Sequence, residues 1–272
     1  MEDRQRFVPL SVRMGKREPF GATTGMPYYL WPSIRDWFNT LINRHEYEYI
    51  SVDNLVLTVS RMFRLPEYPS WRSLTESLAK SDPGMMLDIL DLMMRLANDA
   101  ELKRLEDILF DVAHEYRVDF ENQRLIQRVD DTVYAAYETA VSVQDVASEH
   151  LAKAWLATYS RDTNYDVAVA EATKAVEAVC APLVIPNDKK PSIGKMIRAI
   201  NDAPRNWECS LPATLDRNSV EQFAAALSLV NYASSRHAGG LSSSREHSVA
   251  LLLQAVTVVA WVRERVFRRV ND

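Results

Sequence analysis

Glycine is scarce in this chain, at 7 of 272 residues. Folds that cradle a phosphate need glycines where the backbone turns tightly or approaches a ligand closely. The sequence also contains no GxxxxGK[ST], GxGxxG or GxSxG pattern. These patterns are typical of P-loop proteins, dinucleotide-binding enzymes and α/β-hydrolases. Three enzyme classes therefore lose support, and we expect no cofactor.

Spacings typical of metal ligands are absent as well. The two cysteines, Cys180 and Cys209, form no metal pattern, and no His-x-x-His or HExxH pair occurs. Cys180 falls on an apolar helical stripe, which predicts a small core residue. A disulfide between the two cysteines is possible but is not indicated. We expect no metal site. The histidines are His45, His114, His150, His237 and His247.

A strongly basic balance is also missing, since the net charge is −5. A dedicated duplex-DNA binder would carry a basic surface. RNA contact would then need a local patch, and the best candidate is the arginine run near the C-terminus. Such a run more often complements the dipole of a final helix and aids solubility. Both readings stay open. The run comprises Arg263, Arg265, Arg268 and Arg269.

No apolar run is long enough to span a bilayer. The longest, residues 249–262, is interrupted by Gln254 and Thr257 and falls short of the roughly 20 residues that a transmembrane helix needs. The first six residues are polar and lack the apolar core of a signal peptide. We therefore expect a buried core helix, no membrane association and a cytoplasmic location.

Hydrophobic residues recur mostly at helical spacing, which predicts a mainly α fold. The chain should divide into a helical N-terminal region, residues 1–130, and an antiparallel helical bundle, residues 131–272. Alternating residues at 116–120 and 124–129, around the turn 121–123, predict one small β-hairpin. Residues 1–33 should be irregular, and a helix should start at Ser33. Further helices are predicted at 53–63, 70–79, 85–96, 102–114, 132–159, 165–183, 192–200, 218–232 and 246–270.

The predicted helix 85–96 is rich in methionine. Met-rich helices can form adaptable docking surfaces, but they more often fill cores. We favour the core, because this helix has few polar positions to face water. Its methionines are Met85, Met86, Met93 and Met94.

Two glutamates on one predicted helix invite comparison with a catalytic carboxylate pair. Glu171 and Glu177 are six residues apart, which places them about 120° apart around the helix. They cannot share one proton from that helix. We expect each to be solvated or to contact a neighbouring helix.

The stretch of greatest functional interest runs from Asn231 through Arg236 and His237 to Gly239 and Gly240, and is predicted to follow a helix end. Arginine offers a permanent planar charge to phosphate oxygens, whereas histidine can move a proton near neutral pH. The glycines allow close backbone approach. The alternative is a helix C-cap with an incidental Arg and His. Arg245 and His247 follow closely and could face the same region.

Three short motifs resemble the HEPN domain, an antiparallel helical bundle of prokaryotic toxins and abortive-infection proteins. Residues 168–179 resemble its second helix, residues 191–197 its short Thr/Ser-Leu-Gly-Lys helix, and residues 234–240 its Arg-His-Gly turn. Residues 13–15 and the hairpin are similar to segments that precede HEPN in AbiJ-like proteins.

The resemblance implies a metal-independent endoribonuclease or toxin-like effector in antiphage defence. Catalytic members act as homodimers whose Arg and His line a cleft between two subunits. Carried over, His237 moves the proton, Arg236 binds the phosphate, and Asn231 is a polar partner. The resemblance therefore implies two partners: a second copy of the chain, through the C-terminal bundle, and RNA.

The spacing departs from the family pattern. Catalytic members usually place an arginine four to six residues before the histidine, often as Arg-Asn. Here Val230, seven residues before His237, precedes Asn231 in place of that arginine. Adjacent helical residues such as Arg236 and His237 point about 100° apart. A non-catalytic HEPN-like module that binds a protein or a nucleic acid therefore remains the alternative.

Overall fold

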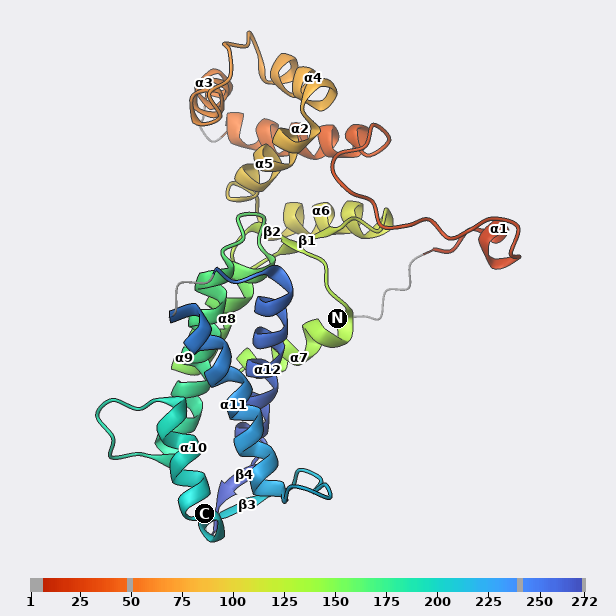
Figure 1. Ribbon diagram of the computed structural model, residues 1–272. Helices are drawn as coiled ribbons and strands as arrows, with labels where there is room; N and C mark the ends of the chain where they lie inside the picture. The colour runs from red at the N-terminus through yellow and green to blue at the C-terminus, as the bar shows by residue number, and fades with distance from the viewer. Residues whose placement is uncertain (1–6, 48–50, 239–241, 271–272) are drawn as a thin grey trace. The chain divides into compact units, whose positions relative to one another are not determined.

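The computed structural model describes residues 7–47, 51–238 and 242–270 (Figure 1), with side chains for all of these except 45–47 and 232–238. The chain is mainly α-helical, which confirms the expected fold class. It divides into two compact units, Met1–Arg128 and Val129–Asp272. Each unit is described by itself.

The N-terminal unit is built from helices and one hairpin. A short helix within residues 1–33 was not predicted, and the second helix begins two residues before Ser33. The elements are α1 (Leu10–Arg13), α2 (Trp31–Tyr47), α3 (Val52–Met62), α4 (Trp71–Ser81), α5 (Pro83–Met94), α6 (Asp99–Asp111), β1 (Tyr116–Asp119) and β2 (Arg124–Gln127).

The Met-rich helix α5 lies in the core of this unit. Met86, Met93 and Met94 are buried, as the pattern predicts. Pro83 stands at the first helical position and Asp82 caps the helix by accepting from the Met85 amide at 2.9 Å. The methionines thus fill core space.

The predicted hairpin is confirmed, with β1 and β2 antiparallel and Val118 opposite Leu125. Both of these side chains are buried. Two strands alone would be marginal, so the hairpin depends on packing against helices. Its contacts with α5 and α6 supply that packing.

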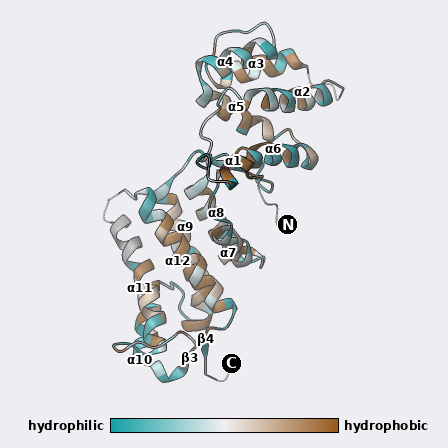
Figure 2. Cartoon of the chain, turned by 90° about the vertical axis from the view of Figure 1, so that its right-hand side faces the viewer, coloured by the Kyte–Doolittle hydropathy of each residue, from teal (hydrophilic) through white to brown (hydrophobic). Residues whose placement is uncertain are grey.

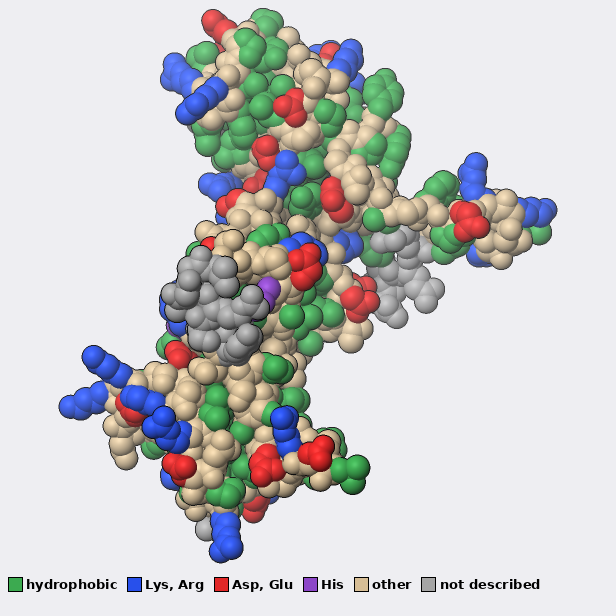
Figure 3. Space-filling model, viewed as in Figure 1, with side chains coloured by type: hydrophobic (Ala, Val, Ile, Leu, Met, Phe, Trp, Pro, Cys, Tyr) green, Lys and Arg blue, Asp and Glu red, His purple; other side chains and the backbone are tan. Residues whose placement is uncertain are grey.

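Residues 7–22 contain no buried side chain. Hydrophobic and basic side chains lie together at the surface of this segment, which carries α1 (Figure 3). The chain first becomes anchored at Thr23, whose amide donates to the Ala113 carbonyl at 2.9 Å and whose carbonyl accepts from the Glu115 amide at 2.8 Å.

His114 completes this anchor from inside the unit. Its ring is buried, and Nδ1 accepts from the Tyr116 amide at 3.0 Å. The ring proton therefore sits on Nε2, which donates to the Gly25 carbonyl at 2.7 Å. Burial lowers the pKa of His114, and the bond to Gly25 only partly opposes this. The buried ring is thus held neutral.

This arrangement predicts acid sensitivity of the N-terminal unit. The unfolded state binds a proton at a higher pH than the folded state, so stability falls as the pH drops below the ordinary histidine value. We expect a loss of up to about 1.4 kcal/mol per pH unit below about pH 6.5, until the lowered folded pKa is reached. Urea unfolding at pH values from 7.5 to 5 measures this loss of stability. A His114→Gln variant should lack this pH-dependent loss. If the free energy of unfolding changed equally with pH in both proteins, His114 would not be its source.

The C-terminal unit is a helical bundle with a small strand pair. Its central helix α9 packs against α8 and α12, and these helices are largely hydrophobic (Figure 2). Trp155 on α8 lies in the core, stacked on Tyr137 at 4.0 Å between ring centroids. The elements are α7 (Asp131–Val141), α8 (Val146–Tyr159), α9 (Tyr165–Val184), α10 (Ile193–Asp202), η1 (Pro204–Asn206), β3 (Trp207–Cys209), α11 (Ser219–Ala238), α12 (Arg245–Arg263) and β4 (Phe267–Arg269).

The single helix predicted at 132–159 is wrong, since α7 and α8 are separated at residues 142–145. Asp145 caps α8 by accepting from the Ser148 amide at 2.8 Å. The Arg263 guanidinium binds both carboxylate oxygens of Asp145, at 2.7 and 2.8 Å, and also the Ala140 carbonyl. Burial alone would raise the pKa of Asp145, but the Ser148 and Arg263 bonds hold it below its usual value.

Replacing Arg263 by alanine should therefore destabilise this unit by about 2 kcal/mol, since it removes several charge-assisted hydrogen bonds. Chemical denaturation checks the value. Arg268→Ala removes an exposed pair with Glu208 and should cost at most about 0.5–1 kcal/mol. Equal losses in the two variants would show that Arg263 does not hold the break between α7 and α8.

The last helix is shorter than the predicted 246–270, because α12 ends at Arg263. Arg265 adopts a positive φ of 57°, which reverses the chain. Residues 267–269 then form β4, antiparallel to β3, with Cys209 opposite Phe267. The Phe267 ring stacks on Phe223 of α11 at 3.9 Å, so core packing holds the strand.

Both cysteines are free thiols. Cys180 is fully buried, and burial raises its pKa to about 12. Its prediction as a core residue is confirmed. Across the described ranges, no helix combines the length and apolar character needed to cross a bilayer.

Candidate functional site

All three predicted site residues lie on α11. This helix continues to Ala238, so the expected end at Tyr232 is wrong. Residues 233–235 are Ala, Ser and Ser, which do not break a helix, and the first glycine comes at 239. The side chains of Arg236 and His237, together with Gly239 and Gly240, lie outside the described part of the chain.

Helix geometry separates the three positions around α11. At about 100° per residue, Asn231 and Arg236 are about 140° apart, Arg236 and His237 about 100° apart, and His237 and Asn231 about 120° apart. Their positions therefore share no single face of the helix. One copy of the chain does not direct all three to a common point through α11 alone.

Asn231 is exposed and lies beside the first turn of α10. Its Oδ1 is 3.7 Å from the place where a Cβ on Gly194 would sit. Ser192 caps that turn by accepting from the Lys195 amide at 3.4 Å. Asn231 therefore lies where α11 approaches the start of α10.

Glu177 of α9 reaches the same turn of α10. Its Oε1 accepts from the Ile193 amide at 3.3 Å. Burial raises the pKa of Glu177, and the Ile193 bond only partly offsets this. Its role is to bind a helix start that would otherwise lack an acceptor.

Glu171 points to a different neighbour, so the two glutamates form no pair, as expected. One oxygen accepts from His150 Nδ1 of α8 at 2.7 Å, and the other accepts from Lys174 at 2.7 Å. Burial alone would raise the pKa of Glu171, but the bonds from Lys174 and His150 outweigh it and lower the pKa. The His150–Glu171 hydrogen bond joins α8 to α9.

The start of α12 is fixed to the start of α9. The Ser243 amide donates to Asp166 Oδ1 at 2.8 Å, and Ser248 Oγ donates to the Tyr165 carbonyl at 3.2 Å. Ser244 caps α12 by accepting from the His247 amide. α11 ends at Ala238, and α12 begins seven residues later at Arg245.

Arg245 and His247 also lie at the start of α12. Arg245 opens α12, and its charge acts on the buried Tyr159 of α8. Burial raises the pKa of the Tyr159 phenol, and Arg245 opposes that rise. His247 is half-buried in the first turn of α12. The sequence indicated Arg245 and His247, whereas nothing in the pattern indicated Tyr159.

The arginine run near the C-terminus is engaged in internal contacts. Arg263 binds Asp145, Arg268 binds Glu208 at 2.5 Å, and Arg269 lies 5.6 Å from the centre of the Trp207 ring. These arginines stabilise the bundle and its strand pair. Arg265, Arg268 and Arg269 are nevertheless exposed.

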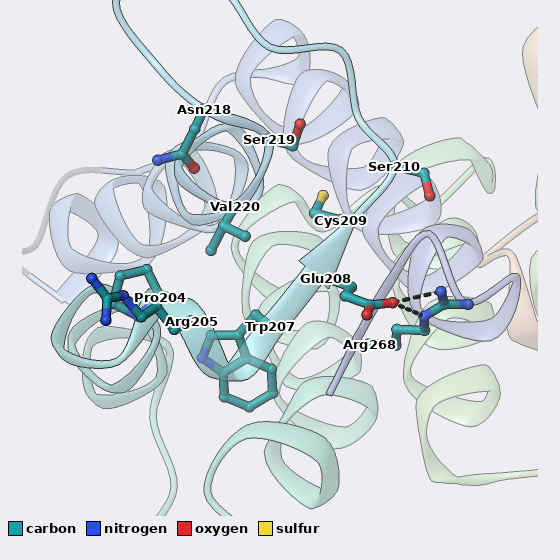
Figure 4. A pocket seen from close by; sticks show the side chains of 10 residues that line it. All are labelled: Pro204, Arg205, Trp207, Glu208, Cys209, Ser210, Asn218, Ser219, Val220 and Arg268. Carbon is teal, nitrogen blue, oxygen red and sulfur yellow. Dashed lines mark hydrogen bonds and ion pairs between the residues drawn. The ribbon is translucent and has the colours of Figure 1, made fainter. Parts of the chain in front are cut away.

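A hollow of about 650 Å³ opens at the other end of α11 (Figure 4). The Glu208–Arg268 ion pair lies on its wall. Burial raises the pKa of Cys209, which makes its thiol a weaker nucleophile. Among the described residues, Asn231 does not line this hollow. The lining comprises Pro204, Arg205, Trp207, Glu208, Cys209, Ser210, Asn218, Ser219, Val220 and Arg268.

No family model, curated protein or solved structure matches this chain. Among the described residues, no three or more His, Cys, Asp or Glu side chains are grouped as metal ligands. The end of α11 and the start of α12 are therefore the candidate site.

Proposed function

We propose that the C-terminal unit is a HEPN-type module that cleaves RNA without a metal ion and acts as a toxin-like effector in antiphage abortive infection. The observation that carries the proposal is the Arg236–His237 pair in the last turn of α11, directly before α12. An RNA substrate would place the activity in the cytoplasm.

The proposed reaction needs only groups that the chain supplies. His237 takes the proton from an RNA 2′-hydroxyl, whose oxygen attacks the neighbouring phosphorus. The bond from phosphorus to the 5′-oxygen breaks, and that oxygen takes up the proton that His237 has accepted. Arg236 offsets the charge that grows on the phosphate oxygens. The products are a 2′,3′-cyclic phosphate and a 5′-hydroxyl.

The proposal includes a homodimer, which the positions on α11 support. Arg236 and His237 are about 100° apart on one helix, so a single copy presents them in different directions. Two copies related by a twofold axis can bring Arg236 of one and His237 of the other together. The proposed site is therefore incomplete without a second copy of the chain.

The test is cleavage of a labelled single-stranded RNA by purified protein in excess EDTA. We expect fragments that end in 2′,3′-cyclic phosphates. Absence of cleavage, or cleavage that disappears with EDTA, would argue against this mechanism.

The second candidate is a non-catalytic module that binds a protein or a nucleic acid. It is favoured by Val230, which is buried where catalytic members carry an arginine. Under this alternative, Arg236→Ala changes binding or oligomerisation and RNA is never cut. An Arg236→Ala protein that keeps wild-type binding and assembly would exclude it.

A further inference from the structure

The segment of residues 7–29, here named the N-terminal arm, exposes large rings to solvent. Phe7, Phe20, Tyr28 and Tyr29 are 79%, 68%, 81% and 64% exposed. Half of the exposed large hydrophobic side chains in the described part of the chain fall within this arm. A folded protein rarely gathers so many without a partner for them.

The arm also carries positive charge that the fold does not use. Within the described part of the chain, the side chains of Arg13, Lys16 and Arg17 make no hydrogen bond or ion pair, and the Arg17 guanidinium only lies 5.6 Å from the centre of the Phe20 ring. In the sequence, the arm holds three Lys or Arg and one acidic residue, Glu18, so its net charge is +2, whereas the whole chain is at −5. By contrast, Arg263 and Arg268 near the C-terminus are bound to carboxylates.

We propose that the N-terminal arm binds single-stranded RNA. The unpaired cations would contact phosphates, and the exposed rings would stack on bases, which is how proteins hold single strands without reading a sequence. The Thr23 and His114 contacts fix the base of the arm to its own unit. The choice of RNA as the ligand rests on the proposed function, and the arm is the place where that RNA would be held.

Two features favour a single strand over other polyanions. Bases in a duplex are stacked on each other and offer no face to Phe20 or Tyr28, so these rings could not stack on a duplex. An anionic membrane suits a longer amphipathic helix, and α1 has only four residues. Exposed rings next to free cations fit unpaired bases on a phosphate backbone.

The experiment measures the affinity of full-length protein for a fluorescent 20-nucleotide single-stranded RNA by anisotropy. All proteins carry His237→Ala, so that the probe stays intact. Removing the three cations by Arg13→Ala, Lys16→Ala and Arg17→Ala should weaken binding about tenfold or more and reduce the salt slope by about 2. The matched control removes three exposed cations of the same unit, Arg61→Ala, Lys80→Ala and Arg95→Ala, and should stay within about twofold.

A second variant isolates stacking. Phe20→Leu keeps an apolar side chain but loses the ring, and should weaken RNA binding about fivefold or more with the salt slope unchanged. Circular dichroism verifies that each variant is folded. Equal affinities for the arm variant, its control and the parent protein would overturn the proposal. Arm-dependent binding to phosphatidylglycerol vesicles with unchanged RNA affinity would overturn it as well.

These outcomes are separable from the proposed function. Cleavage by wild type with arm-independent RNA affinity would remove the role of the arm and leave the nuclease. Arm-dependent RNA binding without any cleavage would keep the arm and remove the nuclease.

Discussion

Replacing Trp155 by alanine is expected to lower the free energy of unfolding of the C-terminal unit by about 3–5 kcal/mol. The indole is 2% exposed and stacks on Tyr137, and it also contacts Tyr134 and Tyr159 at ring-centroid distances of 5.9 and 4.6 Å. Its loss would leave a cavity that three fixed rings cannot fill. Urea unfolding followed by circular dichroism gives the value.

Trp155→Phe is the matched control. The indole Nε1 is buried and has no hydrogen-bond partner, so phenylalanine gives up no hydrogen bond. We expect a cost below about 2 kcal/mol, because most of the stacked area is kept. A loss as large as that of Trp155→Ala would mean that the indole nitrogen has a hydrogen-bond partner, such as a buried water, that stabilises the core.

The second large effect is expected in catalysis. His237→Ala should slow RNA cleavage by about 10²–10⁴-fold, the usual contribution of one general acid or base. The variant should keep its helical content and its assembly state, since the proposed role of His237 is chemical. Initial rates on labelled RNA, at saturating protein, measure the change.

His150→Ala serves as the control for this variant. His150 belongs to the same unit and is bound to Glu171 of α9, which accounts for it structurally. Its removal should cost at most about 1–2 kcal/mol of stability and leave the cleavage rate nearly unchanged. Equal rates for wild type and His237→Ala would remove His237 from the mechanism.

Elements with strong local patterns could be predicted from the sequence. The hairpin follows from strict alternation around a turn, and the Met-rich helix has too few polar positions to be anything but core. The break at 142–145 could not be predicted in this way. It depends on Arg263, which lies 118 residues after Asp145.

The strand β4 was missed for a similar reason. Residues 267–269 continue the helical pattern of α12, and only the distant partners Trp207 and Phe223 show why they become extended. Tertiary contacts override local propensity at such positions.

The candidate site could be predicted in position but not in geometry. The stretch containing Arg236 and His237 follows from residue types alone. The continuation of α11 to Ala238 separates these positions around the helix, and Asn231 turns out to lie beside Gly194 of α10. The proposed shared site therefore depends on a second copy of the chain, which no pattern within one chain can show.

The most direct test of this account uses a heterodimer of one Arg236→Ala subunit and one His237→Ala subunit, purified through two different tags. If Arg236 and His237 act from different copies, one of the two sites is intact, and RNA cleavage should recover to about half of the wild-type rate. A heterodimer no more active than either variant homodimer would contradict a site shared in this way between two copies.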